Sequence, residues 1–180
     1  MQHLNDNQPC QRSKAITDFR NQVLDIYNIP KVASNCLVTI ISRREYSGRV
    51  LERTWINEGE IMTLMQTKYA SCTFRSIDFV NLTMEQQVQI VYESSMIIGM
   101  HGAGMVNVMW LREGMYVIEI FPRRKKRYGY RNMCQYLGCK YFEYRGGYDI
   151  GHLVTKRVQA ADWVNSVDPI FVSMIQDISH

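Results

Sequence analysis

Short apolar segments rich in β-branched residues alternate with amphipathic segments along most of this 180-residue chain. This alternation is typical of α/β proteins, in which helices connect parallel strands. We therefore predict one Rossmann-like lobe over residues 15–180, an α/β fold with a parallel sheet and helices on both faces, preceded by a flexible segment at residues 1–14. The predicted strands are residues 36–42, 72–80, 95–100, 115–121 and 140–144, and the predicted helices are residues 15–29, 57–69, 81–94, 103–111, 128–138 and 168–178, the last closing the lobe.

The composition fits a single globular domain. Hydrophobic residues make up 46% of the chain, which excludes a disordered protein. The formal net charge of +4 suits an anionic ligand but does not by itself indicate nucleic acid. His101 interrupts the longest apolar stretch, so no segment reaches the roughly 20 apolar residues that span a bilayer.

The N-terminal segment and the cysteines bear on the cellular compartment. The first 15 residues lack the apolar core of a signal peptide, so either the protein is cytosolic or its targeting segment lies elsewhere. The five cysteines include no CxxC pair; Cys134 and Cys139 could form a disulfide, or both could be buried free thiols. The sequon at residues 81–83 indicates a secretory compartment only weakly, because such triplets are common.

Two of the predicted helices carry N-terminal capping signals. Asn57 is suited to an N-cap position, with Glu60 three residues later. Thr83 and Gln86 have the spacing of a capping box, in which each side chain binds the other's backbone N–H. We expect a helix to begin after each of these caps.

The segment at residues 96–110 is apolar except for His101-Gly102-Ala103-Gly104 at its centre. A buried strand that leads into a helix would produce this pattern. The helix N-terminus would offer unpaired N–H groups and a partial positive charge to a phosphate, while the glycines let a diphosphate approach the backbone. His101 could donate a hydrogen bond to a phosphate oxygen or a sugar hydroxyl. The alternative is a turn that needs glycine for backbone reasons, with His101 capping it.

Other glycine-rich motifs fit this segment poorly. Gly99, Gly102 and Gly104 fall in the order G-x-x-G-x-G, not in the order of the dinucleotide fingerprint, and no Walker loop is present. The oxyanion loop of some esterases is similar to His-Gly-Ala-Gly, but such enzymes also need a G-x-S-x-G nucleophile elbow, which the chain lacks. An α/β hydrolase is therefore only a third hypothesis.

Arginines follow the first predicted strand. Arg43 and Arg44 come directly after it, and Arg49 and Arg53 follow in the same basic loop. Right-handed crossovers place the C-terminal ends of parallel strands at one edge of a sheet, where ligands of such folds bind. Because a guanidinium matches two phosphate oxygens, we predict phosphate contacts from Arg43 and Arg44, whereas a solvated position is favoured for Arg49.

Glu119 lies late in the otherwise apolar strand at residues 115–121. A carboxylate at such a strand end can accept hydrogen bonds from ribose hydroxyls. The alternative is an outward-facing position or a pair with an arginine. A functional role is favoured, because a strand buried on both faces does not tolerate an unpaired charge.

A basic run at residues 123–127 follows the same strand. No aromatic platform or known nucleic-acid module accompanies it, so we favour a solvated charge cluster near an anionic ligand or a membrane surface and expect no nucleic-acid partner. No carboxylate pair, Asp-x-Asp motif or His/Cys cluster suggests a bound metal.

Four motifs in this order resemble the C-terminal half of glycosyltransferase family 61. That family includes EGF-domain-specific and protein O-mannose N-acetylglucosaminyltransferases and plant xylosyltransferases. The resemblance covers about residues 37–144, although the usual Leu after the glycine turn is Met105 here. The motifs are Ser42-Arg43, Arg53 with Asn57 and Glu60, His101 to Gly104, and Glu119 to Pro122.

The resemblance implies the donor-binding lobe of a two-lobed (GT-B) enzyme. The implied reaction is an inverting, metal-independent transfer of a sugar, GlcNAc or a pentose, from a UDP-sugar to a protein or glycan hydroxyl. Arg43, Arg44, Arg53 and the residues of the His101–Gly104 turn would bind the diphosphate, and Glu119 the nucleoside. The resemblance also implies the lumen of the endoplasmic reticulum or Golgi, with any membrane anchor, the acceptor lobe and the general base outside this chain. The alternative is a nucleotide-binding module without catalysis.

Overall fold

The predicted parallel sheet is confirmed. The computed structural model describes residues 11–30, 35–44, 48, 52–122, 126–152 and 155–179. Five parallel strands form the sheet in the order β2-β1-β3-β4-β5. Their bounds are β1 Leu37–Ser42, β2 Thr73–Asp78, β3 Met96–Met100, β4 Tyr116–Ile120 and β5 Lys140–Tyr144.

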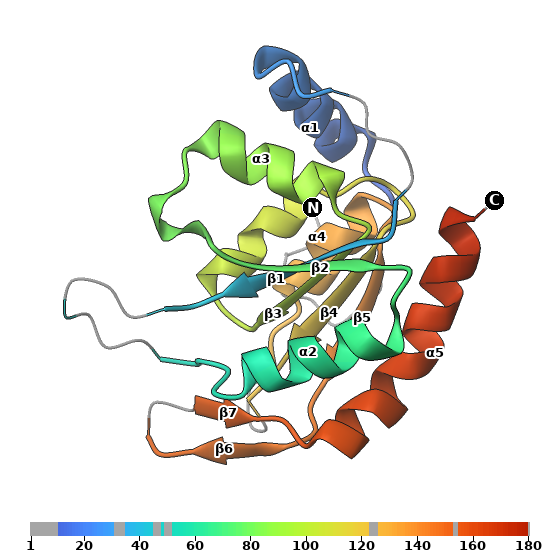
Figure 1. Cartoon of the computed structure of the whole chain (residues 1–180). Helices are drawn as coiled ribbons and strands as arrows, with labels where there is room; N and C mark the ends of the chain where they lie inside the picture. Colours follow the sequence, from blue (N-terminus) through green and yellow to red (C-terminus); the bar gives the residue numbers. More distant parts are fainter. Residues whose placement is uncertain are drawn as a thin grey trace.

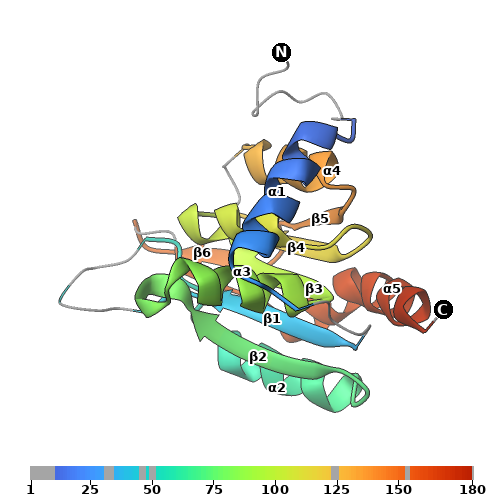
Figure 2. The same ribbon diagram turned by 90° about the horizontal axis from the view of Figure 1, so that it is seen from above.

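Helices cover both faces of the sheet, as Figures 1 and 2 show. The first face carries α1 (Lys14–Ile26), α3 (Met84–Glu93), the 3-10 helix η2 (Ala103–Trp110) and α4 (Gly129–Tyr136). The second face carries α2 (Glu58–Lys68) and α5 (Ala160–Ile178). A short 3-10 helix, η1 (Phe79–Asn81), follows β2.

The core has two layers because successive side chains of each strand point to opposite faces. Val38, Ile98 and Ile118 pack toward α2 and α5. Ile97 and Val117 pack on the opposite face, beneath η2 and α4. Every residue of β3 and β4 is buried, so any charged side chain on these strands needs a partner within the protein.

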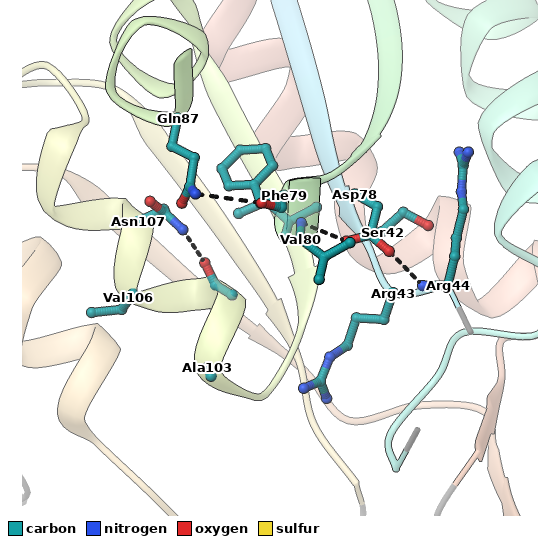
Figure 3. Close-up of a pocket in the computed structure, with 12 residues that line it drawn as sticks. Ser42, Arg43, Arg44, Asp78, Phe79, Val80, Gln87, Ala103, Val106 and Asn107 are labelled. Carbon is teal, nitrogen blue, oxygen red and sulfur yellow. Dashed lines mark hydrogen bonds between the residues drawn. The ribbon is translucent and has the colours of Figure 1, made fainter. Parts of the chain in front are cut away.

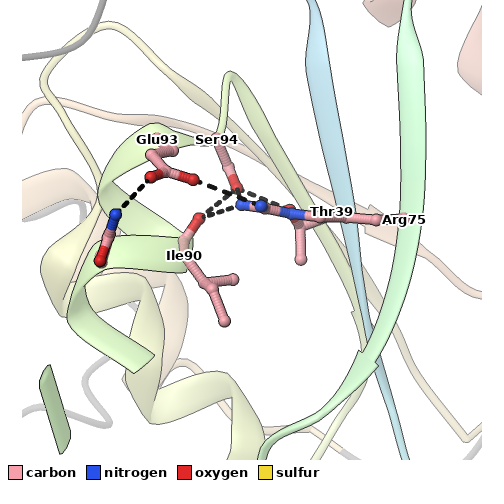
Figure 4. Close-up of polar contacts among 6 residues, drawn as sticks. Thr39, Arg75, Ile90, Glu93 and Ser94 are labelled. Carbon is pink, nitrogen blue, oxygen red and sulfur yellow. Dashed lines mark hydrogen bonds and ion pairs between the residues drawn. The ribbon is translucent and has the colours of Figure 1, made fainter. Parts of the chain in front are cut away.

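Arg75 of β2 links the C-terminal end of α3 to the sheet through hydrogen bonds and an ion pair (Figure 4). Its guanidinium donates to the hydroxyl of Thr39 at 2.8 Å and to the carbonyl of Ile90 at 2.7 Å, and it pairs with Glu93 at 3.3 Å. Ser94 shares the network through a 2.7 Å hydrogen bond to Thr39. A cation at a helix C-terminus satisfies free carbonyls and opposes the negative end of the helix dipole.

The chain termini depart from the predicted bounds. Ser13 caps α1 and Lys14 belongs to it, so the helix begins within the segment predicted as flexible; residues 1–10 of that segment lie outside the described ones. The closing helix is longer than predicted, because α5 begins at Ala160 and contains Pro169. The predicted helix begins beside this proline, because proline usually marks a helix start or a break.

A hairpin not predicted from the sequence precedes α5. It pairs β6 (Tyr148–Ile150) with β7 (Thr155–Arg157) and packs against the start of α2. Lys156 is fully buried, with its ammonium 3.1 Å from Asp149. The side-chain NH2 of Asn57 donates to the carbonyl of Val158 at 2.9 Å, and the side-chain oxygen of Asn57 accepts from the N–H of Val158 at 3.0 Å. Asn57 therefore occupies the predicted N-cap position but makes no side-chain cap, whereas the Thr83–Gln86 capping box is confirmed.

The disulfide of this structure was not predicted. Cys36 and Cys72 are joined just before β1 and β2, with their Cα atoms 4.5 Å apart. Cys134 and Cys139 are buried free thiols, the second of the two alternatives. Burial, followed by a hydrogen bond that the Cys134 thiol donates to Cys139, raises the pKa of Cys134 well above its usual value, so that thiol stays protonated.

Candidate functional site

The strand order creates a switch point between β1 and β3. From β1 the chain crosses outward to β2, and it then returns to β3 on the other side of β1. Connections leave the two central strands in opposite directions, which opens a crevice at their C-terminal ends. Arg43 follows β1 and His101 follows β3, so this crevice lies between two of the segments singled out in the sequence.

The guanidinium of Arg43 lies directly on the glycine turn. A Cβ atom at Gly102 would lie 2.8 Å from Nη1 and 3.1 Å from Cζ of Arg43. The backbone of Gly102 is extended, with φ of 160°. Glycine is therefore required here because a side chain would not fit, and not because of the backbone conformation. Nη1 of Arg43 also donates to the carbonyl of Glu52 at 2.9 Å, which holds the side chain over the turn.

The other two glycines bring the turn close to the sheet. A Cβ atom at Gly104 would lie 3.0 Å from Cγ2 of Ile41, and one at Gly99 would lie 2.7 Å from Sδ of Met105. These contacts support the backbone-packing alternative for the glycines, and the same packing places the main chain of the turn beside a cation. The segment that follows is a 3-10 helix and not the expected α-helix, with Asn107 donating its side-chain amide to the carbonyl of Gly104 at 3.1 Å.

A cavity of about 330 Å³ opens beside Arg43 and the turn (Figure 3). Phe79, Val80 and Val106 form apolar walls, and polar groups of Asp78, Gln87 and Asn107 also line it. Its size and mixed lining suit a small organic ligand. The cavity adjoins the place where Arg43 meets the main chain of the turn.

Arg44 is not brought to the turn. Its backbone N–H donates to Asp78 at 2.8 Å, and its Nη2 lies 3.3 Å from the hydroxyl of Ser76, which in turn binds Glu58. Figure 3 shows Arg43 extending toward the segment that carries Ala103 and Arg44 pointing the opposite way. The two arginines thus lie on different sides of β1's end, and the predicted phosphate contact of Arg44 stays a prediction that its guanidinium position does not favour.

A buried polar chain joins β3, β4 and β5. Nδ1 of His101 lies 2.5 Å from Oε1 of Glu119, and the hydroxyl of Tyr141 donates to Oε2 of the same carboxylate. Glu119 is only 1% exposed and His101 7% exposed. The ring of Phe121 stacks on His101 with their centroids 4.7 Å apart.

These contacts bear on the role of Glu119. Both of its carboxylate oxygens have protein partners, and neither partner is the arginine considered in the sequence. The ribose contact stays a prediction, and the geometry favours a different task, which is to fix the ring of His101. Burial and the charge of Glu119 raise the pKa of the Tyr141 hydroxyl, so Tyr141 remains a neutral donor.

Arg53 adds a second cation close to this cluster. Its backbone is left-handed, with φ of 61°, which is uncommon for a residue other than glycine. Its Nε is buried and has no hydrogen-bond partner among the residues that the structure describes. Burial and Glu119 raise the pKa of Tyr130, whereas the charges of Arg53 and Arg43 lower it, so all three charges act at the same hydroxyl.

The structure thus brings together most of the predicted residues. Arg43, Gly102, His101 and Glu119 form one continuous cluster, and Arg53 acts electrostatically on its edge. The partners Tyr141, Tyr130 and Phe121 were missed; Tyr141 pairs with Val117 in the register of β4 with β5. Of the basic run, Lys126 and Arg127 are exposed; Arg49 and residues 123–125 lie outside the described residues.

Within the described ranges, no three His, Cys, Asp or Glu side chains are close enough together to hold a metal ion. Among those same residues, no helix is both long and apolar enough to cross a bilayer.

The model of the family described as Glycosyltransferase 61 matches residues 3–118, well over half of the chain. The chain belongs to glycosyltransferase family 61. The match includes the Arg43 segment, the glycine turn and all but the last two residues of β4. The family resemblance and the predicted Rossmann-like fold are both confirmed.

Curated relatives agree with this membership. Protein O-linked-mannose β-1,4-N-acetylglucosaminyltransferase 2 of Danio rerio is 30% identical over 79 residues, 41% of this chain. EGF domain-specific O-linked N-acetylglucosamine transferase of Xenopus laevis is 25% identical over 142 residues, 77% of this chain. The β-1,2-xylosyltransferase RCN11 of Oryza sativa subsp. japonica is 25% identical over 134 residues, 65% of this chain.

The family 61 relatives are much longer than this chain. The matched parts make up 13%, 26% and 25% of those three proteins. The chain therefore spans about a quarter or less of the relatives it matches.

Proposed function

We propose that this chain binds the donor of a glycosyltransferase, with the diphosphate of a UDP-sugar in the crevice between β1 and β3. The observation that supports this most is the contact of the Arg43 guanidinium with the main chain of Gly102 at the switch point. A phosphate there would meet a guanidinium and the main chain at the start of a 3-10 helix. Arg53 and His101 add further positive or donor groups at the same edge.

The nucleoside would then occupy the neighbouring cavity. Its apolar walls, Phe79, Val80 and Val106, suit the flat face of a pyrimidine, and Asn107 and Gln87 offer amides to its polar edge. A volume of about 330 Å³ accommodates a group of that size. This assignment replaces Glu119, which is already bound by the protein, as the nucleoside contact that we favour.

The reaction that we propose is an inverting transfer to a hydroxyl of a protein or glycan acceptor. The names of the relatives point to GlcNAc or xylose as the sugar. The departing UDP gains negative charge as the bond to the anomeric carbon breaks, and fixed cations and N–H donors stabilise that charge without a metal ion. The alternative, a nucleotide-binding module, uses the same donor site and differs only in lacking turnover.

A luminal compartment is part of the proposal. The Cys36–Cys72 disulfide suits an oxidising environment such as the endoplasmic reticulum or Golgi. Asn81 of the sequon is exposed at the end of η1, where a glycan could be attached.

Calorimetric titration of the protein with UDP tests the proposal, with a matched pair of arginine variants. Arg43→Lys should weaken UDP by about tenfold or more, because an ammonium cannot donate two parallel hydrogen bonds to a phosphate. Arg44→Lys should change the affinity far less, because the Arg44 side chain lines the cavity but its guanidinium lies beside Ser76 and away from the turn. The absence of heat with the unaltered protein would refute donor binding, and equal losses in both variants would refute the assigned site. Release of sugar from UDP-GlcNAc or UDP-xylose then separates an enzyme from a binding module.

A further inference from the structure

The buried chain of Tyr141, Glu119 and His101 fixes which atom of the imidazole carries a proton. An ionised carboxylate can only accept hydrogen bonds, and its second oxygen already accepts from Tyr141. The 2.5 Å contact with Oε1 therefore requires a proton on Nδ1 of His101. Nε2 makes no hydrogen bond to any residue that the structure describes, so it is the atom left for a ligand.

This assignment restricts what His101 can offer to a phosphate. With Nδ1–H held by Glu119, a neutral imidazole presents a lone pair at Nε2, and a lone pair repels a phosphate oxygen. Only the imidazolium, protonated on both nitrogens, donates from Nε2. A diphosphate beside the Gly102 turn would therefore select the imidazolium.

The charge of the site points the same way. Glu119 is 1% exposed, so its negative charge is poorly screened by solvent. With a neutral His101 the pair carries a net negative charge that opposes an anionic ligand, whereas with the imidazolium the pair is neutral. From other elements, η2 contributes no titratable side chain. Among the described residues, the groups around His101 and its partners are Arg43 after β1, Arg53 before α2, Tyr130 and Cys134 of α4, Glu143 of β5, and Arg145 stacked on Phe121.

We infer that Glu119 is a positioning residue that holds His101 for protonation, so that binding of the donor diphosphate takes up a proton at Nε2 of His101. Only a proton transfers, from buffer to Nε2, and no covalent bond to the ligand forms. The affinity for the donor consequently falls as the pH rises. This inference rests on the proposed function, because it needs a diphosphate at the glycine turn.

The first test examines the protein without ligand. Two-bond ¹H–¹⁵N spectra identify the tautomer of each of the four histidines, and the signal lost in His101→Gln assigns His101. The unaltered protein should show a proton on Nδ1 of His101, and Tyr141→Phe should keep it because the contact with Glu119 remains. Glu119→Gln should abolish this preference. A neutral His101 that carries its proton on Nε2 in the unaltered protein would overturn the inference.

The second test measures proton uptake with UDP-N-acetylglucosamine, whose diphosphate has no group that titrates near neutrality. The heat of binding is measured in buffers of different ionisation enthalpy at several values from about pH 6 to pH 9. The unaltered protein should take up a fraction of a proton, up to one, at one or more of these values. His101→Gln should take up none, and Glu119→Gln should bind about tenfold more weakly or worse with less uptake.

The control is Glu93→Gln, which removes a half-buried, paired carboxylate at the opposite edge of the sheet and should leave the uptake unchanged. Binding of the donor without proton uptake at every pH would overturn this inference and leave the proposed function intact. No binding of UDP or UDP-N-acetylglucosamine would overturn both. Tyr141→Phe keeps the test decisive if Glu119→Gln does not fold, because the proton uptake must persist in that variant.

Discussion

The main chain of Gly102 lies so close to the guanidinium of Arg43 that a single methyl group at residue 102 would come within 2.8 Å of Nη1. Residues from the ends of two different strands thereby form one surface, with a cation on one side and peptide groups on the other. The contact joins a glycine that the sequence places in a turn to an arginine 59 positions earlier in the chain. It also makes the proposed donor site sensitive to the smallest possible substitution.

Gly102→Ala should displace the Arg43 side chain and weaken UDP by about 1.5–3 kcal/mol, the range for a hydrogen bond to a charged group. The extended backbone of residue 102 accepts alanine, so the free energy of unfolding should change little. Calorimetry with UDP measures the first effect and chemical denaturation the second. Gly59→Ala is the control, because a Cβ atom there meets nothing within 4 Å; UDP affinity should not change. Unaltered UDP binding by Gly102→Ala would show that Arg43 does not hold the phosphate.

Val106→Trp should fill the cavity beside the turn, because Val106 lines it and is 42% exposed. We expect UDP to bind about tenfold more weakly, a loss of about 1.4 kcal/mol, while pyrophosphate binds as before. Competition titrations with both ligands measure the two affinities. Val172→Trp is the matched control on α5, where the valine is 45% exposed and far from the cavity. If pyrophosphate and UDP weaken equally, the nucleoside does not occupy this cavity.

Replacing Cys36 and Cys72 by serine should lower the free energy of unfolding by about 4 kcal/mol, because the disulfide closes a long loop in the unfolded chain. Urea denaturation of the oxidised protein and of the double variant measures the difference. A reducing agent should destabilise the unaltered protein and have no further effect on the variant. Equal stability of the two proteins would mean that this bond contributes nothing to the fold.

Gly147→Ala should destabilise the β6–β7 hairpin more than Gly151→Ala. Both glycines are left-handed, with φ of 69° and 65°, so both substitutions carry a similar conformational penalty. Only at residue 147 would a Cβ atom also meet a neighbour, 2.3 Å from the carbonyl oxygen of Arg157. We expect an additional loss of about 2 kcal/mol in thermal or urea denaturation. Indistinguishable stabilities would show that the hairpin shifts to accept the methyl group.

The sheet could be predicted because burial imposes a simple pattern on sequence. A strand covered on both faces, such as β3, must be apolar throughout, and right-handed crossovers then place Arg43 and the glycine turn at the same edge. The direction of each side chain could not be predicted in the same way. Arg43 and Arg44 are neighbours with the same chemistry, yet only the three-dimensional positions of Gly102 and Ser76 decide which one faces the crevice.

Other features depended on contacts that are distant in sequence. Cys36 and Cys72 each precede a strand, but their proximity follows from the pairing of β1 with β2, which the sequence does not specify. The strands of the hairpin have only three residues each, too few for a recognisable alternation. The role of Glu119 was uncertain for the same reason, since Tyr141 reaches it from the next strand and His101 from the preceding one.

The disulfide and the glycine turn lie at opposite edges of the sheet, because Cys36 and Cys72 precede β1 and β2 whereas the turn follows β3. The disulfide is therefore separated from the proposed ligand site by the full length of the strands. An engineer could therefore remove the disulfide to suit a reducing host without redesigning the proposed anion site, and could alter that site without changing the residues around the disulfide.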